Sequence, residues 1–246
     1  MIKNSNIFKI LSILLKFYQI LRKTSVLRLK NKYKRLIMDE KEKITIQTYN
    51  NYALNFSNTI AKLTNYDKTY DDLLKLIQNN SNCLDLACGP ANISSYLKKN
   101  KPELKITGID LSIEMLKIAK QNVPDGVFIN EDFRNITFQE NTFDLVIFGF
   151  GLPYISLENF EIILSKIKWI LKKDGLLYLS FMEGDKNRFE KTSFSANDLI
   201  YIFYHPKDKV ELLLKNNNFK IINNYQLDYL EKNGDISKDL IYLSKR

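Results

Sequence analysis

The sequence predicts an α/β protein with a doubly wound, mostly parallel sheet. Apolar, strand-like runs alternate with helical runs, and such alternation is typical of parallel strands joined by right-handed crossovers. The first strand-like run ends in a turn of small residues, and the second ends in a lone acid, Asp110. The strand-like runs cover residues 82–87, 104–110, 126–130, 143–149 and 176–182, and the helical runs cover residues 91–99, 112–121 and 156–172.

Two regions flank this alternating part of the chain. Residues 44–79 have the apolar spacing of helices that precede the sheet. Residues 183–203 are less regular, and we expect them to cover part of the site. The remaining predicted elements are a helix at 206–217 and a terminal hairpin with strands near 219–228 and 238–244 and a turn at 231–235.

Residues 82–92 predict a buried strand, a tight turn and the start of a helix. Small residues let the backbone of the turn approach a ligand closely, and the start of the helix presents free N–H groups. At the end of the next strand, the Asp110 carboxylate is suited to accept hydrogen bonds from the two hydroxyls of a ribose. Together these features indicate a site for a cofactor that contains a nucleoside.

The turn also bears on which nucleoside cofactor is bound. A dinucleotide site needs the pattern Gly-x-Gly-x-x-Gly, and its three glycine positions fall here on Ala87, Gly89 and Asn92. A pyrophosphate would fit poorly against this turn. A nicotinamide-dependent oxidoreductase therefore stays as an alternative that the turn disfavours.

The string Leu84-Asp-Leu-Ala-Cys-Gly-Pro-Ala91 resembles the first motif of class I S-adenosylmethionine-dependent methyltransferases, usually Leu-Asp-Leu-Gly-Cys-Gly-Thr-Gly. Ala87 and Ala91 stand where that motif has glycine. Residues 48–56 resemble the lid of many small-molecule members of the family, with Asn50 and Phe56 in place of its Asp and second Tyr. Later motifs of the family are resembled in the correct order by residues 108–116, 130–133, 143–150 and 173–180.

The resemblance runs from about residue 45 to the C-terminus and implies the family's seven-stranded, Rossmann-like sheet. It also implies the roles of individual residues. The implied contacts to S-adenosylmethionine are made by Asp85, Ala87, Gly89, Asp110, Leu111, Met115, Asp132, Phe133, Phe148 and Gly149. Ala87 to Gly89 would hold the methionine end and Asp110 the ribose. Asp132 and Phe133 would hold the adenine, and Phe148 and Gly149 would lie beside the transferred methyl group.

The expected activity is transfer of a methyl group from S-adenosylmethionine to an O, N or C atom of a small organic acceptor. Acceptor contacts are expected from Tyr52, Phe150 and Tyr204. Tyr49 or Tyr52 is expected to offer its ring face to the sulfonium charge, and His205 is the best-suited general base if the acceptor loses a proton. A cofactor-binding domain without catalysis, tethered by its basic N-terminus, is a further alternative.

Several of these residues also have a structural interpretation. Asp85, Asp110 and Asp132 are compatible with turn, cap or loop roles, and Ser112 is a candidate helix N-cap. The spacing of Tyr49, Tyr52 and Phe56 also suits core packing. A lone histidine such as His205 is more often structural than catalytic.

The net charge of +9 is concentrated at the N-terminus. Residues 1–37 hold ten basic residues and no acidic one, whereas the rest of the chain holds 27 basic and 28 acidic residues. We therefore divide the chain into a basic amphipathic extension, residues 1–37, and a methyltransferase domain, residues 38–246. The near-neutral domain lacks the basic surface expected of a nucleic-acid-binding protein.

The extension has three interpretations. Its apolar run, residues 7–21, is interrupted by two lysines and is shorter than the roughly 18–20 residues that cross a bilayer. It forms an interfacial helix with peripheral membrane contact, or packs on the domain, or is not translated because translation starts at Met38. The expected location is cytoplasmic, with membrane association through the extension left open.

The two cysteines, Cys83 and Cys88, lie five residues apart, and the single histidine is distant in sequence. That count predicts neither a metal site nor a disulfide framework, and it gives no hint of an oxidising compartment. We expect both cysteines to be small buried apolar residues. The oligomeric state is not indicated by the sequence.

Overall fold

The computed structural model describes residues 38–195, 197–230 and 236–246. The chain divides into two compact units, Met1–Asp39 and Glu40–Arg246, and the fold below is that of the second unit. The predicted basic extension at residues 1–37, with its three interpretations, lies outside the described residues, as does the predicted turn at 231–235. The domain boundary at residue 38 therefore stays a prediction.

The second unit is built on a seven-stranded sheet with the strand order β3-β2-β1-β4-β5-β9-β8. Strands β1 to β5 are parallel, β9 is antiparallel to β5, and β8 is antiparallel to β9. This arrangement confirms the predicted doubly wound, mostly parallel sheet. The strands are β1 (Asn82–Leu86), β2 (Lys105–Asp110), β3 (Val127–Asn130), β4 (Phe143–Phe148), β5 (Leu171–Met182), β8 (Lys220–Leu230) and β9 (Ile236–Lys245).

Helices pack on both faces of the sheet because two separate apolar clusters form there. One cluster joins the sheet to α7 and α8, and the other joins it to α4, α5 and α6. The helices are α4 (Asp67–Leu74), α5 (Asn92–Asn100), α6 (Ile113–Asn122), α7 (Leu157–Ile170) and α8 (Lys207–Asn216). As predicted, Ser112 caps α6, since its hydroxyl accepts a hydrogen bond from the Met115 N–H at 3.2 Å.

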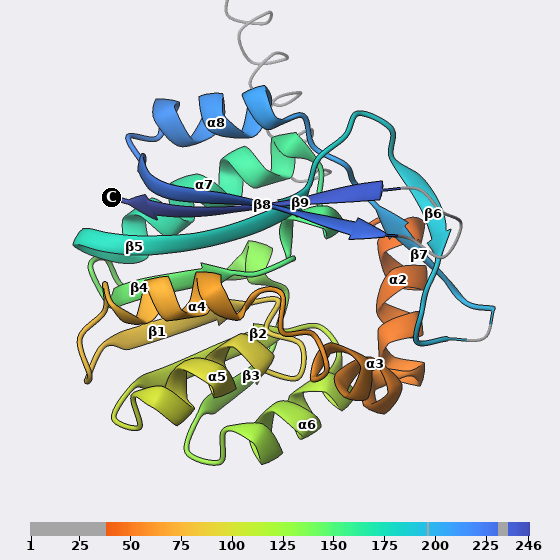
Figure 1. The fold of residues 1–246 in the computed structure, drawn as a ribbon, viewed down its shortest axis with the longest axis horizontal. Coiled ribbons are helices and arrows are strands. Elements are labelled where there is room, and N and C mark those ends of the chain that lie inside the picture. The colour runs from red at the N-terminus through yellow and green to blue at the C-terminus, as the bar shows by residue number, and fades with distance from the viewer. Residues whose placement is uncertain (1–37, 196, 231–235) are drawn as a thin grey trace, which may run out of the picture. The chain divides into compact units, whose positions relative to one another are not determined.

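A separate group of elements, which we call the cover, lies at one end of the sheet. It consists of α2 (Glu40–Asn51), α3 (Ala53–Ile60) and a hairpin of β6 (Arg188–Lys191) and β7 (Leu199–Ile202), which stand together at the right of Figure 1. Two threonine hydroxyls of α2 bond to the β7 backbone. Thr45 Oγ1 accepts from the Tyr201 N–H at 2.8 Å, and Thr48 Oγ1 donates to the Leu199 carbonyl at 2.9 Å.

Two predicted elements differ from the structure. The stretch 183–203, expected to be irregular, contains the β6–β7 hairpin, which is too short to show a clear alternating pattern. Strand β5 begins at Leu171 directly after α7, five residues before the expected start. Leu171 pairs with Phe143, and the register then shifts, so that the ladder continues from Leu176 opposite Leu145.

Within the described residues, every helix is too short or too polar to cross a membrane. Cys83 and Cys88 are buried and carry free thiols, in agreement with the expectation of small buried residues. Burial raises the pKa of both thiols, which keeps them protonated near neutral pH.

Asp85 is an ionisable side chain in the middle of β1, and it is 3% exposed. Its Oδ2 accepts a hydrogen bond from the Ser94 hydroxyl at 2.6 Å, which ties β1 to α5. Burial raises the pKa of the Asp85 carboxyl to about 7, an effect that the Ser94 hydrogen bond opposes and the Asp110 charge reinforces. This carboxyl is therefore protonated in the fold at a pH where an exposed aspartate is charged.

We predict that Asp85→Asn stabilises the protein more at pH 8 than at pH 5. The pKa of Asp85 is about 7 in the folded protein, whereas in the unfolded chain it lies near its ordinary, lower value. Between these two pKa values only the folded state binds the proton, so the free energy of unfolding falls as the pH rises. Asn keeps a hydrogen-bond acceptor for Ser94 and does not titrate. In urea unfolding, the free energy of unfolding of Asp85→Asn relative to the unsubstituted protein should increase by on the order of 2 kcal/mol between pH 5 and pH 8. Asp208→Asn, an exposed change on α8, should show no such growth.

Candidate functional site

A cavity of about 1060 Å³, including the part open to solvent, lies at the carboxyl ends of β1 to β4. The strand order reverses between β1 and β4, and open α/β sheets bind their ligands at this switch point. The floor of the cavity comes from the loops after these four strands, and its walls come from α2, α3 and the end of β7.

The turn after β1 has an unusual backbone. Ala87, Gly89 and Ala91 all have a left-handed conformation, with φ of 53°, 51° and 57°. Glycine adopts it without strain, whereas an L-residue with a side chain loses roughly 1–2 kcal/mol. The two alanines thus occupy positions where the backbone itself favours glycine. The turn is held by hydrogen bonds from the Cys88 N–H to the Ile109 carbonyl at 3.0 Å and from the Ala91 N–H to the Cys88 carbonyl at 2.8 Å.

Asp110, at the end of β2, joins this turn directly. Its Oδ2 accepts a hydrogen bond from the Gly89 N–H, and its Oδ1 accepts one from the Ser112 N–H, both at 2.8 Å. Burial raises the pKa of the Asp110 carboxyl, while these two backbone bonds oppose that shift. The structure therefore brings Gly89 and Asp110 to one cavity, as predicted.

Apolar side chains and an ion-pair cluster follow along the same wall. Leu111, Met115 and Phe133 line the cavity beside Asp110 and offer apolar surface to a flat base. Asp132 lines it too, but its carboxylate accepts hydrogen bonds from the Arg134 N–H at 2.8 Å and from Arg134 Nε at 2.9 Å, and Arg134 Nη2 lies 2.7 Å from it.

Arg134 also links this wall to the cover. Its Nη1 lies 3.0 Å from both carboxylate oxygens of Glu42, on α2. The Arg134 side chain is 3% exposed, and the Asp132 and Glu42 side chains are 11% exposed. Sequence analysis missed Arg134 and Glu42. The only available signal was an arginine two residues after a predicted site acid.

The far end of the cavity follows β4 and is rich in aromatic rings. Gly149, Phe150 and Tyr154 line it from the loop after β4, and Tyr49 and Phe56 line it from the cover. Phe150 has a left-handed backbone with φ of 55°, uncommon for a bulky residue, and its N–H donates to the Ser180 hydroxyl at 2.8 Å. This hydrogen bond helps hold a strained residue at the site.

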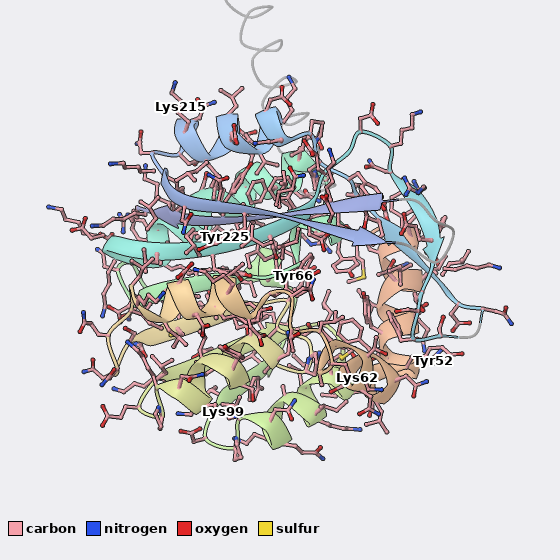
Figure 2. The ribbon with its side chains drawn as sticks, viewed as in Figure 1. Tyr52, Lys62, Tyr66, Lys99, Lys215 and Tyr225 are labelled. Atoms are coloured by element: carbon pink, nitrogen blue, oxygen red, sulfur yellow. The ribbon has the colours of Figure 1, made fainter. Side chains whose placement is uncertain are left out.

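Three of the predicted site residues belong to the core or the periphery. Phe148 is fully buried, with its ring against those of Phe133 and Phe160. Asp85 faces Ser94 beneath the turn. Figure 2 shows Tyr52 at the outer edge beside α3, whereas Tyr66 lies in the interior. None of the three lines the cavity, so the cavity gives no support to their predicted contacts with cofactor or acceptor.

His205 and Tyr204 also lie outside the lining of the cavity. The Tyr204 hydroxyl donates to Glu190 and accepts from Arg188. His205 is 2% exposed, and its Nε2 donates to the Leu152 carbonyl at 3.0 Å. Burial lowers the pKa of the imidazole, which favours its neutral form. These contacts fit a structural brace better than the predicted general base.

A family model described as a methyltransferase domain matches residues 83–175. A demethylmenaquinone methyltransferase from Thermotoga maritima is 34% identical over 118 residues, which make up 48% of this chain and 51% of that protein. A ubiquinone/menaquinone biosynthesis C-methyltransferase from Campylobacter jejuni is 32% identical over 111 residues, or 43% and 46% of the two chains. These matches support the predicted resemblance to class I S-adenosylmethionine-dependent methyltransferases.

Solved structures agree on the fold. A methyltransferase from Methanosarcina mazei has a TM-score of 0.61 at 15% identity, over 71% of this chain and 96% of that one. The 1,6-didemethyltoxoflavin-N1-methyltransferase of Burkholderia thailandensis has a TM-score of 0.63 at 13% identity, over 85% and 92% of the two chains. The chain spans about half the length of the curated relatives that it matches.

The cavity fits S-adenosylmethionine by the chemistry of its donors and acceptors. The Asp110 carboxylate has lone pairs left for the two ribose hydroxyls after its two backbone hydrogen bonds. Leu111, Met115 and Phe133 suit the adenine ring. Helix α5 begins at Asn92 beside the turn without a side-chain N-cap, so its first N–H groups suit a carboxylate.

We predict that Asp110→Asn weakens binding of S-adenosylhomocysteine at least tenfold. An amide has one acceptor oxygen, so either the Gly89 or the Ser112 N–H would face an NH₂ group, and the ribose would lose a charged acceptor. Isothermal titration calorimetry at neutral pH measures the change. Asp208→Asn on α8 should bind like the natural protein, and an unchanged affinity for Asp110→Asn would remove the ribose role.

Replacing Arg134 by methionine should destabilise the protein by about 3–5 kcal/mol, because two largely buried carboxylates would lose their shared cation. Affinity for S-adenosylhomocysteine should fall as well, since the wall at Asp132 and the cover at Glu42 would no longer be joined. Urea unfolding and calorimetry give the two readings. Lys117→Met removes an exposed ion pair with Glu114 and should change stability by about 1 kcal/mol or less.

Proposed function

We propose that this chain transfers a methyl group from S-adenosylmethionine to a ring carbon of a small, uncharged aromatic acceptor of the quinol type. The observation that carries the proposal is a cavity that continues from the Asp110 turn into an end lined by Tyr49, Phe56, Phe150 and Tyr154. The names of the relatives, a demethylmenaquinone methyltransferase and a quinone C-methyltransferase, support a quinol and a carbon atom.

The charged groups of the cavity also favour an uncharged acceptor. Asp110 is bonded to two backbone N–H groups, and Asp132 and Glu42 share Arg134. Among the described residues that line the cavity there is no lysine or histidine. An anionic acceptor would therefore lose its water without gaining an unpaired cation nearby.

When bound, S-adenosylmethionine supplies a methyl group already activated by its sulfonium. The chain's own residues have the tasks of binding, orienting and excluding water. Asp110 fixes the ribose, and the ring faces near Tyr49 suit a positive charge. The cover screens the cavity from solvent, and holding two reactants in line contributes several kcal/mol to catalysis. An electron-rich ring carbon bonds to the methyl group as the methyl–sulfur bond breaks, and the ring then releases the proton of that carbon to solvent to restore its aromaticity. The attack itself needs no general base, which agrees with the position of His205 outside the lining.

The partners and location of the protein are part of the proposal. We propose a small-molecule acceptor and no nucleic-acid partner, since residues 38–246 carry nearly balanced charge. A cytoplasmic location and peripheral membrane contact through residues 1–37 stay predictions. These relatives are named for quinones, and access from a membrane surface would suit an apolar acceptor.

The proposed function is tested with the purified full chain. Calorimetry should detect binding of S-adenosylhomocysteine and no binding of NADH, which distinguishes a methyltransferase from an oxidoreductase. With methyl-labelled S-adenosylmethionine, a 2-alkyl-1,4-naphthoquinol should gain one methyl group on carbon, as detected by mass spectrometry. Asp110→Asn should lower this turnover at least tenfold at subsaturating cofactor.

Two results would contradict the proposal in different ways. Binding of NADH in place of S-adenosylhomocysteine would favour the oxidoreductase alternative. Binding of S-adenosylhomocysteine with no methylation of the quinol, nor of any molecule in a lipid extract or metabolite pool, would favour the cofactor-binding domain without catalysis.

A further inference from the structure

Two tyrosine hydroxyls meet at the aromatic end of the cavity. Tyr49 lies on α2, and Tyr154 ends the short helix η2 (Leu152–Tyr154) after β4. Their hydroxyl oxygens are hydrogen-bonded to each other, although the residues are 105 positions apart in the sequence. Both side chains line the cavity. The pair therefore joins the cover to the loop that follows β4.

The pair is held rigidly from both sides. The Tyr49 ring lies against Phe56 and Phe194, with centroid distances of 5.2 and 5.3 Å. On the other side, η2 is held by a hydrogen bond from the Phe203 N–H to the Pro153 carbonyl at 2.8 Å and by the bond from His205 Nε2 to the Leu152 carbonyl. A hydrogen-bonding group fixed in this way loses little freedom when a ligand arrives.

A count of protons shows what the pair offers. Two phenol groups carry two protons, and one of them forms the bond between the oxygens. In the part of the chain that the structure describes, each of these hydroxyls has the other as its hydrogen-bond partner and no further one. The second proton is therefore available to a molecule in the cavity. Burial raises the pKa of Tyr154 to about 12 and that of Tyr49 well above its ordinary value. The pair therefore donates a proton in a hydrogen bond at neutral pH and does not take one up.

We infer that the hydroxyl pair of Tyr49 and Tyr154 donates a hydrogen bond to an oxygen atom of the acceptor. The ligand class is an uncharged ring that bears a carbonyl or hydroxyl oxygen and whose hydrocarbon frame contacts Phe56, Phe150 and Phe203. This inference rests on the proposed function and adds the group that orients the acceptor. A polar atom that is held at the aromatic end of the cavity selects strongly against molecules that lack its partner.

A purely structural role for the pair makes a different prediction. If the bond only fastened α2 to η2, its loss would reduce stability and would affect every cavity ligand alike. If the pair recognises an oxygen, its loss would affect ligands with that oxygen selectively. A pair of probes that differ in one carbonyl separates these roles.

The experiment uses the full chain saturated with S-adenosylhomocysteine and two probes, 1-tetralone and tetralin, which share a ring frame and differ in a carbonyl oxygen. Calorimetry gives the ratio of their affinities. The double variant Tyr49→Phe/Tyr154→Phe should reduce the preference for 1-tetralone by at least fivefold, about one hydrogen bond. Tyr201→Phe, which removes another cavity-lining hydroxyl that bonds to Lys41, should leave the ratio within twofold of the natural protein.

An unchanged ratio in the double variant, or no binding of either probe to the natural protein, would overturn the inference. Infrared spectroscopy of 1-tetralone bound to the natural protein needs no variant. Its carbonyl stretch should move to lower frequency than in hexane, and an unshifted band would refute donation even if the double variant fails to fold. If S-adenosylhomocysteine binds but the oxygen is not recognised, only this inference fails. If the cofactor product itself does not bind, the proposed function fails.

Discussion

The site depends on one carboxylate and the hydrogen bonds that it accepts from two backbone N–H groups. Asp110 holds Gly89 on one side and Ser112 on the other, and thereby fixes the loops after β1 and β2 relative to each other. Without this acceptor the left-handed turn at Ala87 to Ala91 would lose its side-chain partner at the end of β2. The same oxygens that shape the turn keep lone pairs for the cofactor, so the folding and binding roles of Asp110 cannot be separated by a single substitution.

The other half of the cavity is built from contacts between residues that are distant in sequence. Helix α2 is attached to β7 through Thr45 and Thr48 and to the wall of the cavity through Glu42 and Arg134. These contacts close the aromatic end and decide what an acceptor meets there. The cofactor half uses features that the fold imposes on its strand tips, whereas the acceptor half is set by the cover.

The difference between the two halves explains what the sequence predicted. The strands, the turn and Asp110 were predictable because their signals are local, and five parallel strands place their tips at one edge. Arg134 and Tyr154 were missed because their partners on α2, Glu42 and Tyr49, lie 92 and 105 residues away, and nothing in a single sequence pairs them. His205 and Phe148 were placed near the chemistry by their position in the chain, but their side chains are buried in the core.

The acceptor end combines extensive ring surface with few hydrogen-bonding groups, and this balance determines its selectivity. Dispersion and burial of the rings bind any flat apolar molecule of suitable size, and an added or missing methylene changes that binding by only about 1–3 kcal/mol. The orientation of the acceptor therefore has to come from a directional contact. The fixed hydroxyls of Tyr49 and Tyr154 meet that requirement, since a ring rotated away from them would leave a buried donor without a partner. The ring surface would then supply affinity, and a single donated hydrogen bond would decide which ring atom faces the methyl group.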